Sequence, residues 1–148
     1  MTAQKTPKNP VSVASRRPFR LTPPPPPKEC DEQTALFIWA ALAARTDPRL
    51  HLLNASQNGL HTSPQQARRA KACGMKAGVP DLDLPVSCQG YHGLRIELKR
   101  RRGVPSDVSA AQQWWLQQLR EQGYRAEVCY GWESARQVIT EYLRGAAA

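Results

Sequence analysis

The sequence has no apolar run approaching the roughly 18–20 residues that a helix needs to cross a bilayer. No apolar stretch of the kind that a secretory signal requires follows Met1. The four cysteines form no C-x-x-C pair and the three histidines show no ligand spacing, which argues against a zinc knuckle and against a disulfide framework. These absences predict a cytoplasmic protein with reduced thiols.

Acidic residues are absent from the first 28 positions, which hold six of the 21 basic residues and eight of the 13 prolines. The run Pro23–Pro27 is typical of a polyproline II rod, and the segment offers little that could fill a core. We therefore expect residues 1–28 to form a disordered basic arm and residues 29–148 to form one folded domain. The arm is either a tether that adds affinity for DNA or a solubilising tail.

Helical and strand patterns alternate after the arm and predict a layered α/β or α+β core of about 115 residues. The clearest strand has charged and apolar residues in alternation, so that Glu97 and Lys99 share its polar face. Asp31 is expected to cap the first helix. The predicted helices span residues 31–44, 65–76, 109–122 and 133–144, and the predicted strands span residues 50–53, 79–86, 94–99 and 124–130.

Three ionisable residues stand out by their placement. Asp81 opens one predicted strand, and Glu97 and Lys99 lie on the next. If the two strands are hairpin neighbours, both carboxylates can bind one hard divalent cation, and the lysine can hold an attacking water. The alternative is that Glu97 and Lys99 form an ion pair on a solvent-exposed strand, while Asp81 only follows Pro80 in a turn.

Longer sequence segments around these three residues favour the interpretation as a cation-binding site. Four of them occur in order, at residues 78–82 (GVPDL), 93–100 (GLRIELKR), 109–112 (SAAQ) and 123–124 (GY). With them the sequence resembles, over residues 29–143, the VRR-NUC family of the PD-(D/E)xK nuclease superfamily, in particular its small standalone forms from phages and prophages. The resemblance implies a restriction-endonuclease-like α/β fold, with a mixed sheet core flanked by helices, in a phage or prophage protein of a bacterial cytoplasm.

The resemblance also assigns roles to residues of the expected site. Asp81, Glu97 and Lys99 take the places of the signature aspartate, glutamate and lysine. The backbone carbonyl of Leu98 is an expected further metal ligand. The implied cofactor is Mg²⁺ or Mn²⁺, bound by Asp81 and Glu97.

Two further residues carry expectations from the same resemblance. Members have a glutamate on the first helix that approaches the metal, for which we choose Glu32, with Glu29 as the alternative. Gln112 corresponds to the family's glutamine and is expected to contact the lysine or the waters of the site.

The implied activity is metal-dependent hydrolysis of DNA phosphodiester bonds. No base-reading motif is visible, which favours recognition of DNA by shape, and the standalone relatives are associated with branched DNA, including four-way (Holliday) junctions, and with homodimers. The basic residues expected to bind the DNA backbone are Arg68, Arg69, Lys71, Arg100, Arg101 and Arg102. Two alternatives stay open, namely a non-catalytic DNA-binding accessory protein and a sequence-specific restriction-like nuclease.

Overall fold

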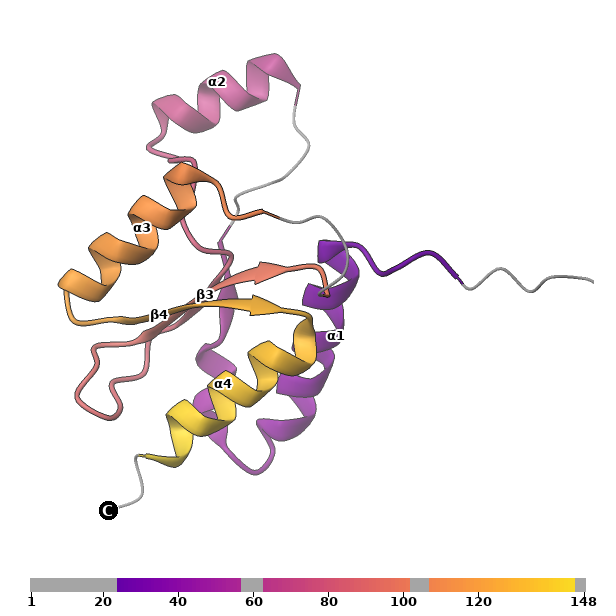
Figure 1. Ribbon diagram of the computed structural model, residues 1–148, viewed down its shortest axis with the longest axis vertical. Helices are drawn as coiled ribbons and strands as arrows, with labels where there is room; N and C mark the ends of the chain where they lie inside the picture. The colour runs from indigo at the N-terminus through magenta and orange to yellow at the C-terminus, as the bar shows by residue number, and fades with distance from the viewer. Residues whose placement is uncertain (1–23, 57–62, 102–106, 146–148) are drawn as a thin grey trace, which may run out of the picture.

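The computed structural model of the chain describes residues 24–56, 63–101 and 107–145. In this part, helices surround a four-stranded mixed sheet (Figure 1). The helices are α1 (Glu29–Ala43), the 3₁₀ helix η1 (Pro48–Leu52), α2 (Pro64–Ala72), α3 (Ala110–Glu121) and α4 (Trp132–Arg144). The strands are β1 (Asn54–Ala55), β2 (Leu82–Leu84), β3 (Leu94–Lys99) and β4 (Arg125–Tyr130). The predicted mixed sheet flanked by helices is confirmed, while residues 1–23 of the predicted arm lie outside the described residues.

The strand order in the sheet is β1-β2-β3-β4. β2 pairs antiparallel with both β1 and β3, and β3 pairs parallel with β4. A parallel pair needs a crossover, and α3 lies on the connection between β3 and β4. β2 and β3 are thus the hairpin neighbours that the predicted site requires, with Leu82 opposite Ile96.

The two faces of the sheet are covered differently. α1 and α4 pack against each other and against β3 on one face, whereas α3 packs against β3 and β4 on the other (Figure 1). Leu36 of α1, Ile96 of β3 and Ile139 of α4 meet in the first layer, and each is almost fully buried. Burial of each such side chain contributes about 1.5–3 kcal/mol, so this layer holds β3 firmly in place.

Two predictions for the first third of the chain were wrong in detail. α1 begins at Glu29 rather than near Asp31, and Asp31 closes its first turn because its Oδ2 accepts the Lys28 amide at 2.8 Å. The strand predicted at residues 50–53 is the 3₁₀ helix η1. Pro48 fixes the first helical φ there, and the Asp47 side chain caps the turn by accepting the amide of Arg49.

β2 is shorter than the strand predicted at residues 79–86. Pro80 and Pro85 flank it and have no N–H to donate to a sheet ladder, so pairing is confined to the residues between them.

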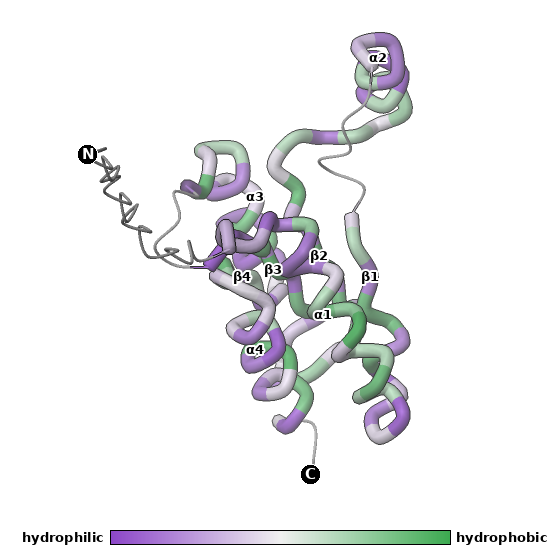
Figure 2. The backbone as a smooth tube through the Cα atoms, turned by 90° about the vertical axis from the view of Figure 1, so that its right-hand side faces the viewer, coloured by the Kyte–Doolittle hydropathy of each residue, from purple (hydrophilic) through white to green (hydrophobic). Residues whose placement is uncertain are grey.

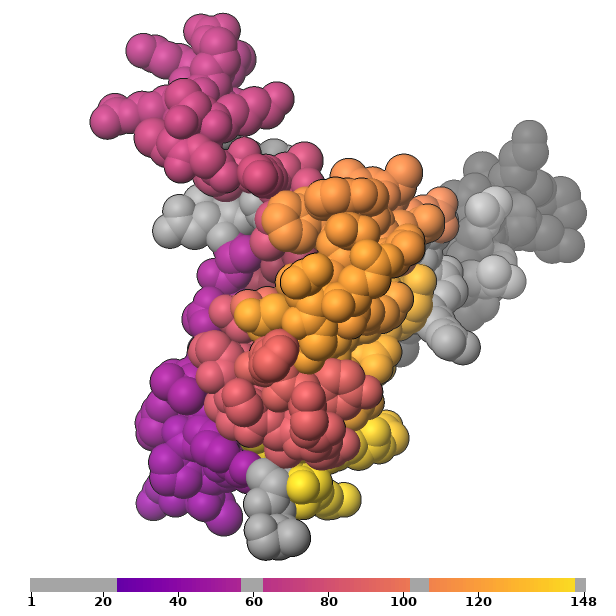
Figure 3. All heavy atoms as spheres, turned by 90° about the vertical axis from the view of Figure 1, so that its left-hand side faces the viewer, coloured from indigo at the N-terminus to yellow at the C-terminus, as the bar shows by residue number. Residues whose placement is uncertain are grey.

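α2 starts as predicted and stands apart from the sheet. Ser63 accepts the amide of Gln66, and Pro64 occupies the first turn. The helix ends at Ala72, ahead of the predicted Lys76, and has no buried residue. Figures 2 and 3 show it projecting from the rest of the molecule. None of the described helices is long and apolar enough to span a membrane.

Candidate active site

A cleft of ≈ 650 Å³ lies between the first turns of α1 and α3 and the C-terminal half of β3. Its wall includes the side chains of Glu29, Gln33, Asp81, Glu97, Lys99 and Gln112. The three signature residues of the sequence analysis are therefore brought together in one cleft, together with the predicted glutamine.

Asp81 is the residue directly before β2, and its side chain is hydrogen-bonded to β3. Its Oδ2 accepts the backbone N–H of Leu98 at 2.9 Å, and its own carbonyl accepts the Ser56 amide at 2.7 Å. A strand residue directs its N–H and C=O toward the same neighbour in an antiparallel ladder. The N–H of Leu98 points to Asp81, so the carbonyl of Leu98 faces the same side. A cation bound by both the Asp81 carboxylate and this carbonyl would require that orientation.

Glu97 and Lys99 leave β3 on the same face, with Lys99 Nζ 3.0 Å from Glu97 Oε1. The pair is not exposed to solvent, because Glu97 is 1% and Lys99 6% exposed. The alternative of an ion pair on a solvent-exposed strand is therefore wrong. The alternation predicted for this strand is confirmed, but both of its faces are covered.

Gln112 contacts Glu97 rather than the lysine. Its Nε2 donates to Glu97 Oε1, the same oxygen that Lys99 approaches. Its Oε1 accepts the Ser109 amide at 2.8 Å, while Ser109 Oγ accepts the Gln112 amide, which together form a capping box at the start of α3. The cap orients the side-chain amide so that its nitrogen faces the cleft, and the S-x-x-Q pattern was the available sequence signal for it.

Burial and mutual repulsion change the acidity of the carboxyl groups. Burial raises the pKa of Glu97 to about 7, with a further rise from the neighbouring Asp81 charge that Lys99 only partly opposes. Burial also raises the pKa of Asp81, against the Leu98 N–H and the Lys99 charge. Burial alone would lower the pKa of Lys99, but its hydrogen bond to Glu97 and the nearby carboxylates raise it. The lysine therefore remains an ammonium.

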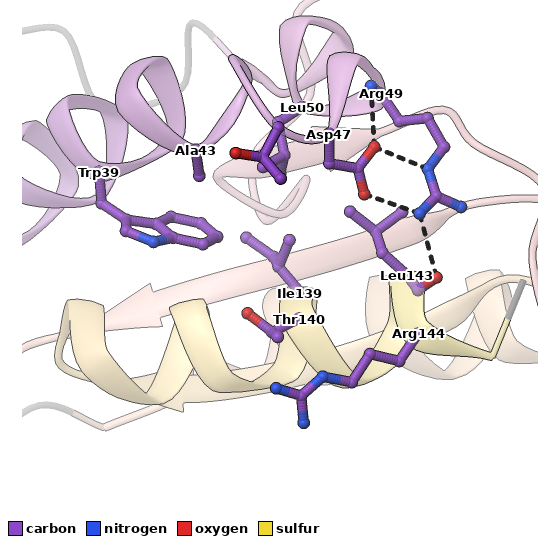
Figure 4. A pocket seen from close by; sticks show the side chains of 10 residues that line it. Trp39, Ala43, Asp47, Arg49, Leu50, Ile139, Thr140, Leu143 and Arg144 are labelled. Atoms are coloured by element: carbon purple, nitrogen blue, oxygen red, sulfur yellow. Dashed lines mark hydrogen bonds and ion pairs between the residues drawn. The ribbon is translucent and has the colours of Figure 1, made fainter. Parts of the chain in front are cut away.

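A second hollow of ≈ 580 Å³ lies between α1, η1 and α4 (Figure 4). Its charged lining residues are Asp47, Arg49 and Arg144. Asp47 holds Arg49 in a two-point contact, and Arg49 also donates to the carbonyl of Leu143. Trp39 and Ile139 contribute apolar surface. Asp47, the carboxylate that lines this hollow, is thus engaged by Arg49.

Residues 38–133, about two thirds of the chain, match the VRR-NUC domain family. This chain belongs to the VRR-NUC family. It is also similar to a solved structure described as a VRR_NUC domain protein, with a TM-score of 0.68 and 28% sequence identity over 81% of this chain and 91% of that chain. No curated protein matches the chain. VRR-NUC is a nuclease family, so the assignment indicates a nuclease-type function that acts on DNA.

In this VRR-NUC domain, Glu29 rather than Glu32 borders the cleft. Glu29 Oε1 lies 3.8 Å from Lys99 Nζ. Glu32 is 1% exposed and binds elsewhere, because its Oε1 accepts Arg101 Nε and its Oε2 accepts the amide of Trp132, each at 2.9 Å. Glu32 thus joins the start of α1 to the start of α4. The structure places the alternative glutamate of the sequence analysis, and not the preferred one, beside the site.

The predicted DNA-binding residues that the structure describes fall into two groups. Arg68, Arg69 and Lys71 are exposed on α2. Arg100 and Arg101 are instead engaged within the protein, Arg100 with backbone carbonyls and Arg101 with two glutamates. Arg102 lies outside the described residues. No sequence pattern indicated the internal partners of Arg100 and Arg101.

Proposed function

We propose that the protein is a metal-dependent endonuclease that hydrolyses DNA phosphodiester bonds in the cleft of Asp81, Glu97 and Lys99. The observation that carries the proposal is the meeting of two carboxylates and an ammonium in one cleft of a nuclease-family domain, two of them from β3 and one from the residue before β2. The arrangement is consistent with the PD-(D/E)xK superfamily. Phosphodiesters resist hydrolysis strongly, so positioned groups that offset developing charge supply most of the rate gain.

The donor set of the cleft suits a hard divalent cation. Glu97 Oε2 is buried and has no hydrogen-bond partner within the described residues, which leaves a ligand oxygen available. Across those same residues, no three His, Cys, Asp or Glu side chains form a metal-binding group. Mg²⁺ and Mn²⁺ tolerate so few protein ligands because they keep waters and bind substrate phosphate. Asp81, Glu97 and the Leu98 carbonyl would hold the ion, which supplies Lewis acidity and a more acidic bound water.

The remaining residues of the cleft have distinct roles in this proposal. Lys99 is protonated, so it cannot accept a proton, and it serves to orient the attacking water and to offset negative charge that builds up on the phosphate. Gln112 fixes the orientation of the Glu97 carboxylate through its hydrogen bond.

Branched DNA, such as a four-way junction, is the substrate class that we favour. The exposed basic residues of α2 would contact phosphates, and such contacts carry no sequence information. A junction with two-fold symmetry calls for two symmetry-related active sites, and for this reason a homodimer is part of the proposal.

Substitution at the cleft tests the proposal directly. Asp81→Asn and Lys99→Ala should each abolish nicking of linear, flapped and four-way DNA with Mg²⁺ or Mn²⁺, while binding in EDTA stays nearly intact. Asp83→Asn is the matched control, because Asp83 lies two residues further along, pairs with Arg95 and does not line the cleft. Mg²⁺ should also raise the Tm of the wild type but not of Asp81→Asn.

Three results would redirect the proposal. Cleavage that survives both substitutions contradicts the site. A wild type that binds DNA but never cuts supports the non-catalytic accessory protein. A recurrent motif at cut sites on random linear duplex supports a sequence-specific nuclease.

A further inference from the structure

Trp114 is a large aromatic side chain that the fold leaves in solvent. It lies on α3 and is 55% exposed. Its ring makes an edge-to-face contact with the ring of Trp115, with the ring centroids 5.5 Å apart. Trp115 is itself fixed, because its Nε1 donates to the carbonyl of Ala77 at 3.1 Å. An indole ring is therefore presented to solvent in a defined place, although tryptophan is ordinarily well buried.

This ring stands beside the candidate active site. Gln112, two residues earlier on α3, donates to Glu97 in the cleft, and Ala77 forms part of the cleft wall. Residues two apart on a helix point to nearly opposite sides and are separated by about 3 Å along the axis. Trp114 therefore lies just outside the cleft, on the helix that forms its wall. A nucleotide that flanks a phosphodiester bound in the cleft would meet this ring.

The segment that joins α2 to β2 runs close to the start of α3 (Figure 1). Gly78 of this segment has a φ of +88°, and a Cβ there would lie 2.7 Å from the backbone carbonyl carbon of Ala111. Only glycine permits so close an approach of the two backbones. Lys76, which is exposed, precedes Ala77 in the same segment. The segment that fixes Trp115 thus also carries a cation.

The sequence around the two tryptophans has positive charge and no carboxylate. Residues 63–80 contain four basic residues and no acidic one, and residues 108–120 contain Arg120 and no acidic one. Exposed aromatic rings next to cations are the combination that binds single-stranded nucleic acid, because bases stack on the rings while the cations neutralise phosphates. The charge therefore argues for a nucleic-acid occupant of the Trp114 ring rather than an apolar one.

We propose that Trp114 stacks on an unpaired base of DNA beside the cleft and that Lys76 binds the phosphate of that nucleotide. The inference rests on the proposed function of the cleft, and it names the feature of a branched substrate that is recognised. Within a continuous duplex both faces of each base are covered by its neighbours, so the ring has no internal base on which to stack. Trp114 should therefore favour branches with unpaired nucleotides over linear duplex and over a fully paired four-way junction.

The test compares the binding of the full-length protein to three DNA molecules in EDTA. They are a fluorescein-labelled duplex of about three helical turns, the same duplex with a thymidine flap of about ten nucleotides, and a fully paired four-way junction. Trp114→Ala should weaken binding to the flap about 5- to 100-fold and binding to the other two by less than about twofold. Trp114→Phe keeps a ring and should lose less than about threefold on the flap. Gln117→Ala, an exposed neutral position further along α3, is the control.

The salt dependence separates the two proposed contacts. Lys76→Gln should lower the slope of log K against log salt on the flapped DNA by about 0.7, because it removes one phosphate contact to a single strand. Trp114→Ala should leave that slope unchanged, since the indole ring carries no charge.

A fluorescent base reports the stack directly. A flap that carries 2-aminopurine in place of one thymine should lose fluorescence when the wild type binds, because stacking on an indole ring quenches the probe. At saturating protein the fluorescence should stay unchanged with Trp114→Ala. Moving the probe along the flap identifies the nucleotide that stacks.

Several outcomes would overturn the inference. Unchanged affinity of Trp114→Ala for the flap, or equal losses on flap and duplex, would show that the ring does not select an unpaired base. A wild-type dimer that becomes monomeric in Trp114→Ala, measured by light scattering, would assign the ring to a contact between two copies instead. Failure of the wild type to bind any of the three DNA molecules would contradict the proposed function, whereas binding that does not depend on Trp114 contradicts this inference alone.

Discussion

The buried carboxyl group of Glu97 couples the stability of the fold to the chemistry of the cleft. Burial and the Asp81 charge raise its pKa to about 7 from the ordinary 4.5. The folded protein therefore holds a proton that the unfolded chain releases near pH 4.5. The resulting stabilisation is complete below that pH and is lost as the pH rises through about 7.

Glu97→Gln should remove this pH dependence in the absence of metal. The amide has the shape of the protonated acid and cannot ionise, so we expect the variant to be more stable than the wild type at pH 8 by at least about 1 kcal/mol, or roughly 3–4 °C in Tm. The two proteins should converge near pH 5. Thermal melts in EDTA across this range measure the difference, and parallel pH profiles would contradict the prediction.

Gln112 is expected to affect the reaction through Glu97. Gln112→Ala removes the hydrogen bond that orients Glu97 and should lower kcat roughly 10- to 100-fold. Ser109→Ala is the control, because it weakens the same capping box and should cost about 1 kcal/mol of stability with little loss of cleavage. Equal losses of activity in the two variants would show that Gln112 acts only as a cap.

At the scale of elements, Glu32 joins α1, α4 and the end of β3. Glu32→Ala leaves the amide of Trp132 without its partner and removes one of the two glutamates that hold Arg101. The free energy of unfolding should fall by about 1–3 kcal/mol, the cost of an unsatisfied buried amide. Glu29→Ala, three residues earlier on the same helix and half exposed, should cost less than about 1 kcal/mol. Denaturant melts distinguish the two. The Mg²⁺-induced rise in Tm should persist in Glu32→Gln, and its loss would place Glu32 at the metal after all.

α2 is the element whose role is expected to be electrostatic. Arg68→Gln and Arg69→Gln should each reduce the slope of log K against log salt by about 0.9, because each removes one phosphate contact. Stability should stay within about 0.5 kcal/mol, since the helix has no buried residue. Gln65→Ala, an exposed neutral position on the same helix, is the control. An unchanged slope in the arginine variants would exclude α2 from the DNA interface.

For the molecule as a whole, the sequence was informative where local signals and tertiary packing agree. Alternation predicted β3 at its observed bounds, and the predicted starts of α2 and α3 lie within one residue of the observed ones. The same reasoning failed at residues 50–53, because a short apolar run does not distinguish a strand from a helical turn and the cap at Asp47 decided the outcome.

The candidate site was predicted in its centre but not at its margins. Glu97 and Lys99 lie on β3 and Asp81 directly precedes the adjacent strand β2, so their convergence follows from a single hairpin. The choice between Glu29 and Glu32 depends on the rotation of α1 against β3 and α4, and the partner of Glu32 is an amide 100 residues away. Contacts of that kind leave no local trace in a sequence.

The spacing of Glu97 and Lys99 on one paired strand has a consequence for refolding. Side chains of a strand alternate, so a slip of β3 by one residue would bring Ile96 and Leu98 to the cleft and both charged groups into the apolar layer. A molecule with the wrong register would therefore lack the site altogether and would be inactive. If the cleft cuts DNA as proposed, specific activity after dilution from denaturant counts the fraction of chains whose hairpin has closed in the native alignment.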